Sequence, residues 1–504
     1  MVQRSVAHDF TGGQAGRLAS THFTERQWAK LKGVVLESDA EVRSQWPWEP
    51  VGADIGFTEV GYTDGLLVAL DGNGAIWTTP FPDPSADPST ATWTELTAAP
   101  SDTGYRLCGL VPLPRDEGQG FVTALLVNGR ERTEEAVAVY EDGDGNPAHY
   151  AFTSSYPNDT DDDAMPRANL SIMWGDFLVL GDIEWLEDED ANFASTNAGS
   201  YPHALWLAQP GEPESWDLLD VVYTGIKTGQ GAPQVLGLET VDTGLMVLTS
   251  GGVYHLRGTP SQFDYEELRP GNGVAGRFAA SWWPSTGAAV WLNQTGQVWH
   301  SNGEAFLRLD EPLGLDAEEP SEPWAAGWDD FVLVGRSGRT FVFRAFDEDG
   351  AWTELVTPDG VHNCIPVGAT LYGVDGDGRV WRLNRTSQDR GQIDGTPHEV
   401  VVATRTFEGG EGHRLSFWRH FGIRAEPESP GATLEQVTVY AGPALSSESE
   451  SMTLLETPRP LDGRDELVVP GPGPALEAAV EVEFAGDVSV EQVSVAWVES
   501  RGSN

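Results

Sequence analysis

The chain has 504 residues, with 30 lysines and arginines against 78 aspartates and glutamates, and its formal net charge is −48. A field this negative repels phosphates, which excludes a protein that grips DNA or anionic lipid through charge. The residues are 39% hydrophobic and 10% aromatic, enough for a large core, which excludes a disordered acidic tail.

No apolar run is long enough for a membrane-spanning helix, and residues 1–9 contain no apolar signal region. We therefore expect neither membrane insertion nor secretory export. The acidity itself has two interpretations. It is typical of proteins adapted to high salt, where charges are screened over about 3 Å at 1 M, and also of a GC-rich genome that disfavours lysine codons. The sequence leaves both open, and we favour the first.

In chain order, residues 1–50 are expected to form an N-terminal arm with a strand that enters the first repeat. Within the arm, Thr24–Lys32 is a candidate for a short helix, with Thr24 as its cap. Helix is otherwise nearly absent from the pattern.

Residues 51–397 contain a recurring hairpin, in which an apolar strand and a short Gly/Asp/Asn turn precede a glycine, one more residue, then Val, Ile or Thr, and an aromatic. The glycines at 251, 296, 338 and 378 are spaced by 45, 42 and 40 residues, the period of a four-stranded propeller blade. We predict a β-propeller of seven blades, with six or eight as alternatives. The copies are Leu66–Trp77, Leu245–Tyr254, Ala289–Trp299, Phe331–Phe341 and Leu371–Trp381.

Weaker copies and outer strands fill the spaces between these hairpins. Polar segments with one aromatic, such as Trp93–Leu96, Phe263–Glu266, Phe306–Leu309 and Trp352–Leu355, fit the outermost strand of a blade. Degenerate hairpins are Phe121–Val127 with Ala136–Tyr140, and Phe177–Leu180 with Ala204–Leu207. Tyr156–Asp163 and Glu184–Ser200, rich in Asp, Asn and Ser, are interpreted as loop insertions.

Residues 398–504 lose the blade spacing and are expected to form a separate antiparallel β-sandwich. The chain is thus predicted to be all-β. The expected sandwich strands include Leu415–Arg424, Gln436–Tyr440, Glu466–Val469, Ala479–Phe484 and Val493–Val498, and prolines such as Pro427, Pro458, Pro470 and Pro472 separate them.

No motif in the sequence carries recognisable catalytic or metal chemistry. The ten histidines lack metal spacing, and Cys108 and Cys364 are too few for a disulfide framework. Asp142–Asn146 and Asp375–Gly378 resemble calcium loops, but turn chemistry explains them better, because the terminal Glu of a calcium loop is missing. We therefore predict no catalytic residue, no cofactor and no metal ligand, and expect the protein not to be an enzyme.

Three segments carry a resemblance to a known family. Asp9–Leu18, Trp28–Val35 and Val42–Trp46 resemble the opening of podovirus-type tailed-virus β-propeller tail nozzle proteins, although Gly33 stands where that family usually has Asn. Gly244–Gly258, continuing through Ser261–Phe263 to Ala289–Gly296, looks like the family's central blades. The C-terminal sandwich is also similar to what such proteins carry.

The resemblance implies a structural virion protein of the tail, assembled in the host cytoplasm, that forms a homo-oligomeric ring. Its expected partners are the portal-adaptor protein and, in some tails, fibres or spikes; genome DNA would pass through the ring during ejection without specific binding. Candidates for a gate are the insertions Tyr156–Asp163 and Glu184–Ser200. The alternatives are a receptor- or glycan-binding propeller, in which Trp46, Trp48, Trp282 and Trp283 would stack on sugars, and a propeller glycosidase.

Overall fold

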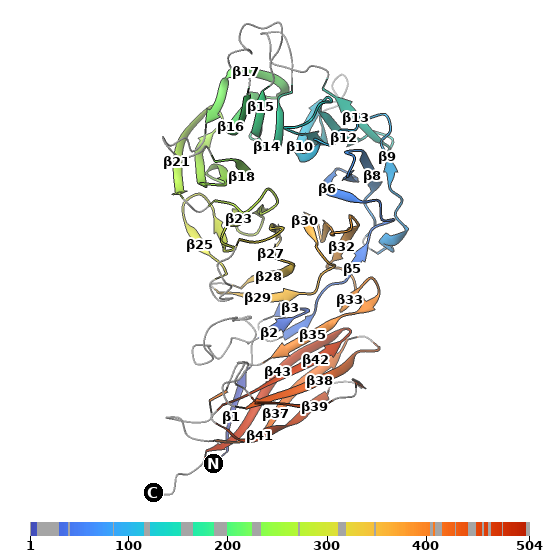
Figure 1. Ribbon diagram of the computed structural model, residues 1–504, viewed down its shortest axis with the longest axis vertical. Helices are drawn as coiled ribbons and strands as arrows, with labels where there is room; N and C mark the ends of the chain where they lie inside the picture. Colours follow the sequence, from blue (N-terminus) through green and yellow to red (C-terminus); the bar gives the residue numbers. More distant parts are fainter. Residues whose placement is uncertain are drawn as a thin grey trace.

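Strands that follow one another in the chain pair into small antiparallel sheets, and these sheets are arranged around a ring (Figure 1). The computed structural model describes residues 2–7, 30–38, 41–83, 85–114, 121–152, 165–185, 199–223, 233–270, 273–310, 319–346, 349–403, 407–408, 416–428, 430–441, 450–455, 458–461, 465–475 and 477–499. Seven groups of four strands make up the ring in this part of the chain: five are separate four-stranded sheets, and two are parts of larger sheets. The predicted seven-bladed β-propeller is confirmed.

Each blade is numbered here in chain order, and its four strands run from the inside of the ring to the outside (Figure 1). Blades 1 to 4 comprise β6 (Phe57–Thr63), β7 (Leu66–Asp71), β8 (Ile76–Pro80) and β9 (Thr94–Glu95); β10 (Arg106–Pro114), β11 (Phe121–Asn128), β12 (Val137–Glu141) and β13 (Pro147–Ala151); β14 (Arg167–Trp174), β15 (Phe177–Trp185), β16 (Gly199–Gln209) and β17 (Glu212–Tyr223); and β18 (Val235–Val241), β19 (Gly244–Thr249), β20 (Gly252–Thr259) and β21 (Gln262–Pro270).

In blade 1, a 3₁₀ turn, η2 (Pro88–Thr90), lies in the connection between β8 and β9. Blades 5 to 7 complete the ring. Their strands are β22 (Ala280–Trp283), β23 (Ala288–Leu292), β24 (Val298–Ser301) and β25 (Phe306–Arg308); β26 (Trp324–Trp328), β27 (Phe331–Arg336), β28 (Arg339–Phe346) and β29 (Asp349–Leu355); and β30 (His362–Val367), β31 (Thr370–Val374), β32 (Val380–Asn384) and β5 (Trp48–Pro50).

The predicted hairpins are the second and third strands of the blades. The degenerate copies are also confirmed: β11 pairs with β12, and β15 pairs with β16. The repeat glycine has positive φ at Gly74, Gly296, Gly338 and Gly378, as a tight hairpin requires. Gly251 is an exception, because its φ does not lie in that region.

Apolar clusters fill the spaces between neighbouring blades. The largest of these spans blades 4, 5 and 6 and includes Met246, Trp283, Trp291 and Trp352, all buried. At two inner-strand positions the neighbouring blades approach so closely that only glycine fits. A Cβ at Gly109 would lie 2.3 Å from the Ser171 carbonyl oxygen, and one at Gly327 would lie 2.1 Å from that of Trp282.

The ring is closed by a strand from the N-terminal part of the chain. β5 pairs with β32 as the outermost strand of blade 7, so this blade combines residues near 50 with residues 362–384. β33 (Gln392–Ile393), which pairs with β34 (Thr396–Pro397), then covers the outer edge of β5. Blade 7 therefore holds the two ends of the propeller together.

A two-sheet sandwich lies beside blades 6 and 7 (Figure 1). Its core, between the sheets, includes Phe421, Ile423, Val482 and Phe484. One sheet contains β3 (Val34–Ser38), β4 (Glu41–Ser44), β43 (Val488–Glu499), β37 (Ser416–Pro427) and β41 (Asp465–Ala475), with β1 (Val2–Ala7) on β43; the other contains β2 (Lys30–Lys32), β35 (Glu399–Ala403), β42 (Glu477–Ala485), β38 (Thr433–Ala441) and β39 (Glu450–Leu455), with β36 (Phe407–Glu408) on β42 and β40 (Arg459–Pro460) on β38.

Two details of the sandwich differ from the sequence-based expectations. Lys30–Lys32, the end of the expected helix Thr24–Lys32, is strand β2, because it fills the space between β29 and β35; the rest of that segment lies outside the described residues. Pro470 and Pro472 lie within β41 and do not separate strands. β41 is an edge strand, where a residue without an N–H is tolerated.

The N-terminal residues contribute strands to the sandwich, which the sequence did not indicate. β1, β3 and β4 join the sheet of the C-terminal strand β43, and β2 pairs with both β29 and β35. Through β2, the sheet of blade 6 continues into the sandwich. Among the described residues no helix is both long and apolar enough to cross a membrane.

Candidate functional site

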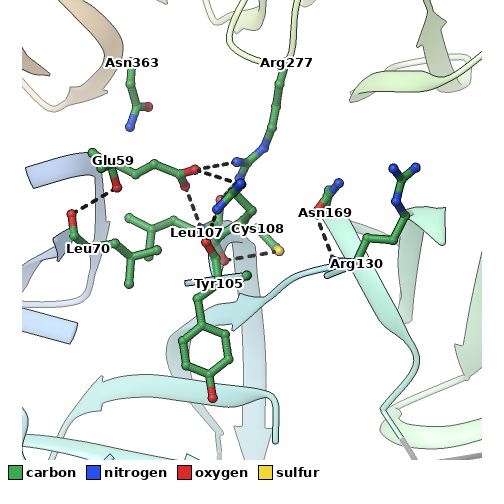
Figure 2. Close-up of polar contacts among 12 residues, drawn as sticks. Glu59, Leu70, Tyr105, Leu107, Cys108, Arg130, Asn169, Arg277 and Asn363 are labelled. Carbon is green, nitrogen blue, oxygen red and sulfur yellow. Dashed lines mark hydrogen bonds and ion pairs between the residues drawn. The ribbon is translucent and has the colours of Figure 1, made fainter. Parts of the chain in front are cut away.

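The inner strands of all blades converge on the axis of the ring (Figure 1), and a charged cluster joins residues of different blades there (Figure 2). Glu59 of β6 accepts a hydrogen bond from Arg277, whose Nη1 lies 2.7 Å from Oε1. The other Arg277 nitrogen, Nη2, donates to the Leu107 carbonyl oxygen at 2.7 Å, while the Leu107 N–H donates to Glu59 Oε2 at 2.8 Å. Three groups from three blades thus close one cycle.

Arg277 comes from the segment that leads into blade 5, whereas Glu59 and Leu107 belong to blades 1 and 2. Blades 5 and 1 are not neighbours, so the arginine side chain crosses the axis. It passes over the Phe278 ring, with Cζ 5.0 Å from the centroid. The side chains of Glu59 and Arg277 are only 7% and 17% exposed. We call Glu59 and Arg277, together with the Leu107 backbone, the axial ion pair. Both carboxylate oxygens of Glu59 already accept hydrogen bonds, so the group links parts of the ring and is not free to bind a ligand.

A second buried carboxylate ties blades 2, 3 and 4 together. Asp182 on β15 is 1% exposed and receives Arg130 Nη1 at 2.7 Å, Asn169 Nδ2 at 2.6 Å and Gln234 Nε2 at 2.8 Å. Its φ is +56°, an unusual value for a residue other than glycine. The pairing of β15 with β16 is irregular between Gly181 and Ile183, which turns this side chain toward the neighbouring blades.

For a third carboxyl group near the axis, that of Glu239, no ion pair is found within the described part of the chain. Glu239 lies on β18 opposite Met246, and strand alternation puts it on the same face as Val241. Met246 and Val241 both belong to the apolar cluster between blades 4, 5 and 6. Glu239 keeps partial contact with solvent, but desolvation by the surrounding protein raises the pKa of its carboxyl group to about 8. At neutral pH this group is therefore largely protonated.

The calcium-like loops are hydrogen-bonded turns, as predicted. In the Asp142 turn, Oδ1 accepts the N–H groups of Asp144 and Asn146 at 2.9 and 2.8 Å. In the Asp375 turn, Oδ1 accepts the N–H groups of Asp377 and Arg379, and Oδ2 accepts the indole N–H of Trp381 at 2.7 Å. Within the described part of the chain, no group of three His, Cys, Asp or Glu side chains is placed to hold a metal ion.

Cysteine and histidine side chains near the ring are held in their neutral forms by burial. Cys108 and Cys364 are free thiols, and desolvation raises the pKa of Cys108 to about 12 and that of Cys364 well above its usual value. Desolvation likewise lowers the pKa of His300 to about 4 and lowers the pKa values of His255 and His398. These groups are packed rather than poised for proton transfer.

The tryptophans considered for sugar stacking lie mostly in the core. Trp46, Trp48 and Trp283 are at most 3% exposed, and only Trp282 is half-buried. Of the gate candidates, Tyr156–Asp163 lies outside the described residues, and Glu184–Ser200 is described only at its ends, where β15 pairs with β16.

Sequence reasoning missed the axial ion pair, Asp182 and Glu239. The signal for Glu59 and Glu239 was a single charged residue inside an otherwise uncharged inner strand, Phe57–Thr63 and Val235–Val241 respectively. For Arg277 no local signal exists, since its partner is 218 residues away.

Comparisons with known proteins give only remote similarity. No protein-family description matches the chain, and no curated protein sequence matches it. Solved structures that resemble it include BamB from Moraxella catarrhalis (13% identity, 77% of this chain and 98% of that chain, TM-score 0.37) and PorZ of the type-IX secretion system of Porphyromonas gingivalis (13%, 75% and 44%, TM-score 0.39). Virginiamycin B lyase from Staphylococcus aureus is a third (10%, 67% and 98%, TM-score 0.42). With such scores, the fold assignment rests on the sheets themselves.

Proposed function

We propose that the protein is a structural component that assembles with copies of itself into a ring, and that this ring is the tail nozzle or tail hub of a short-tailed virus. One observation carries the assembly part of the proposal: the sheet of blade 6 continues through β2 into the sandwich. A closed ring requires every subunit to repeat the same rotation. A subunit with an internal hinge would meet that condition poorly, whereas a continuous sheet fixes the angle between propeller and sandwich.

Side chains at the junction strengthen the same connection. Gln45 is completely buried, donates to the Val356 carbonyl oxygen at 2.5 Å and accepts the Val356 N–H at 2.7 Å, so its amide imitates a strand pairing. Next to it, Arg43 Nη2 lies 2.8 Å from Oδ2 of Asp487, a carboxylate that is 1% exposed. These contacts support a stiff two-part subunit.

The charge of the protein supports the nozzle rather than a DNA-gripping ring. A lumen formed by subunits of net charge −48 would repel phosphates, so that the genome could leave without sticking. The carboxylates Glu59 and Asp182 are held in fixed ion pairs, which supports a structural role for the axis. The choice of a tail nozzle is supported by the resemblance of Trp28–Val35, Val42–Trp46 and the central blades to that family. The partners would then be the portal-adaptor protein and, where present, fibres or spikes.

The test is imaging of the purified full chain at high salt by negative-stain electron microscopy, with masses from mass photometry. We expect rings with a central hole, which then bind a purified portal-adaptor complex. Monomers at every concentration would overturn the assembly proposal. Monomers that bind glycans on an array would favour the alternative, a receptor- or glycan-binding propeller.

We also propose that the acidity is an adaptation to high salt. Repulsion among 78 acidic side chains grows as the Debye length rises from about 3 Å at 1 M to about 10 Å at 0.1 M. The thermal midpoint of unfolding should therefore fall steeply as salt drops below about 1 M. A midpoint indifferent to salt would favour genome composition instead.

A further inference from the structure

A cavity of about 440 Å³ opens between blades 2 and 3. Its lining includes Leu110–Pro112, which lie further along β10 than Leu107, so the cavity is displaced along the inner strand from the axial ion pair. Its volume is within the range of roughly 300–1,000 Å³ that is typical of ligand sites. The lining residues are Leu110, Val111, Pro112, Phe121, Thr123, Met173, Gly175, Asp176, Leu178 and Gly211.

The lining is apolar inside and continues onto the surface. Among the described residues that line it, Thr123 and Asp176 are the ones with polar side chains. Phe121, at the start of β11, is 64% exposed, which is unusual for a phenylalanine on a strand. Apolar surface therefore continues beyond the cavity, and an occupant that covers both the cavity and Phe121 has to be elongated. This favours a chain over a compact small molecule.

The charge at the rim is negative. Asp176 is exposed in the turn between β14 and β15, and its carbonyl oxygen accepts the N–H of Gly211 at 2.8 Å, which joins this turn to the next. Glu212, also exposed, directly follows Gly211. None of the ten lining residues in the described part of the chain is basic. An occupant that complements this rim carries a positive charge beside its apolar group.

We propose that this pocket binds an extended segment of a partner protein in which a large apolar side chain is flanked by lysine or arginine. The apolar side chain enters the cavity between blades 2 and 3, a second apolar contact covers Phe121, and the basic side chain meets Asp176 at the rim. This inference goes beyond the proposed nozzle function and does not depend on it, because it concerns one face of the single chain.

The experiment uses the full chain and two fluorescent decapeptides, each with a central Leu-Phe pair, flanked either by lysines or by glutamates. Fluorescence anisotropy is measured in 1 M NaCl, where a Debye length of about 3 Å suppresses general attraction to an acidic protein. We expect saturable one-to-one binding of the lysine peptide and at least tenfold weaker binding of the glutamate peptide. A lysine peptide with Ser-Ser in place of Leu-Phe should also bind at least tenfold more weakly.

Variants locate the binding. Phe121→Ser removes the exposed ring and Thr123→Trp fills the cavity, and each should weaken binding at least tenfold. Asp176→Asn removes the charge at the rim and should weaken binding about threefold. The matched controls, which should not change it, are Tyr265→Ser, an aromatic 43% exposed on β21, and Asp377→Asn, an exposed carboxylate on blade 7. Because Phe121 is exposed, its replacement tests the site even if Thr123→Trp fails to fold.

Three results would overturn the proposal. The first is no binding of the lysine peptide, or binding that the Phe121 and Tyr265 variants weaken equally. The second is equal affinity for the lysine and glutamate peptides. The third is self-association that Phe121→Ser abolishes in sedimentation velocity, since the occupant would then be a second copy of this chain.

Discussion

The ring and the sandwich are both antiparallel sheet, but they take their strands from the chain in different ways. Blade 4, for example, lies entirely within residues 235–270. In the sandwich, β43 pairs with β1, so that Val498 lies opposite Val2. The ring is therefore made mainly of local contacts, whereas the sandwich depends on the meeting of the two chain ends. Local pairings form at a lower loop-closure cost than distant ones.

One short segment belongs to both regions. β4 ends at Ser44 in the sandwich, and β5 begins at Trp48 in blade 7. Between them, Gln45 is fixed to Val356 beyond blade 6, and its own carbonyl oxygen accepts the N–H of Gly391. Closing the ring and completing the sandwich are thus coupled through residues 41–50. The propeller, whose blades repeat locally, therefore depends for its closure on the segment that also builds the sandwich.

Among substitutions compared at one pH, the largest effect is expected where the sandwich is tied to this segment. Arg43→Ala removes the partner of Asp487, which is 1% exposed, and should lower the free energy of unfolding by about 3 kcal/mol, because an uncompensated carboxylate stays buried. Urea unfolding, followed by tryptophan fluorescence, measures this loss. Lys32→Ala is the control: it breaks the Lys32–Glu399 pair, whose side chains are 31% and 46% exposed, and should cost less than about 1 kcal/mol.

The shape of the unfolding transition tests whether ring and sandwich unfold together. If ring closure and sandwich are coupled, Arg43→Ala shifts one common transition. Two separate transitions, with the one assigned to the propeller unchanged, would show instead that the ring closes independently.

A somewhat smaller effect is expected at the axis of the ring. Arg277→Ala leaves Glu59, 7% exposed, without its closest cation, and should cost about 2–3 kcal/mol, less than a fully buried pair because Leu107 N–H still binds the carboxylate. Arg277→Lys should recover only part of it, since one ammonium group cannot reproduce the forked contact to Glu59 and Leu107. Thermal unfolding of both variants measures the ranking.

The control for the axial ion pair is Arg339→Ala on blade 6. Its pair with Glu354 is more exposed, 49% at the arginine, and should contribute less than about 1 kcal/mol. Equal losses from the two alanine variants would mean that the axial ion pair is no more than a surface contact.

Much of the ring could be predicted from the sequence because its signals are local. A hairpin glycine such as Gly378 and the aromatic that follows, Trp381, act within one turn, and their repetition at about 42 residues gave the blade count. The outer strands and the sandwich strands also followed from alternation. These features need no knowledge of residues far away in the chain.

The parts that escaped prediction are those set by distant partners. Lys30–Lys32 forms a strand because β29 and β35 offer it unpaired edges, which overrides any local helix preference. Arg277 finds Glu59 across the ring, at a separation of 218 residues. The pocket between blades 2 and 3 likewise depends on how two sheets meet, so the candidate site as a whole lay beyond sequence reasoning.

Glu239 gives the ring a pH dependence of its own. Its pKa rises from 4.5 to about 8 on folding, so its contribution to stability is present below about pH 4.5 and is lost as the pH rises through 8. Between pH 5 and pH 9 the wild type should lose up to roughly 2–4 kcal/mol through this group. Glu239→Gln should flatten that decline in urea unfolding at each pH.

The control for this pH effect is Glu95→Gln, an exposed carboxyl on β9, which should leave the profile unchanged.

The acid side of the stability profile has a different source. The lowered pKa values of His255, His300 and His398 stabilise the fold above about pH 6.5, and that stability is lost as the pH falls through the folded values, in both variants alike.

The smallest expected effect separates two turns within the ring that look alike in sequence. Asp375→Ala on blade 7 leaves the buried indole N–H of Trp381 without its acceptor and should cost about 1–2 kcal/mol. Asp142→Ala on blade 2 removes only hydrogen bonds to N–H groups in an exposed turn, and should cost about 0.5–1 kcal/mol. Differential scanning calorimetry of the two variants resolves the ranking. Asp375→Asn should recover only part of the loss, because its single amide oxygen can accept from either the turn N–H groups or the Trp381 indole N–H but not from both. A reversed order would mean that the turn backbone, and not the tryptophan it anchors, is what the repeated aspartate stabilises.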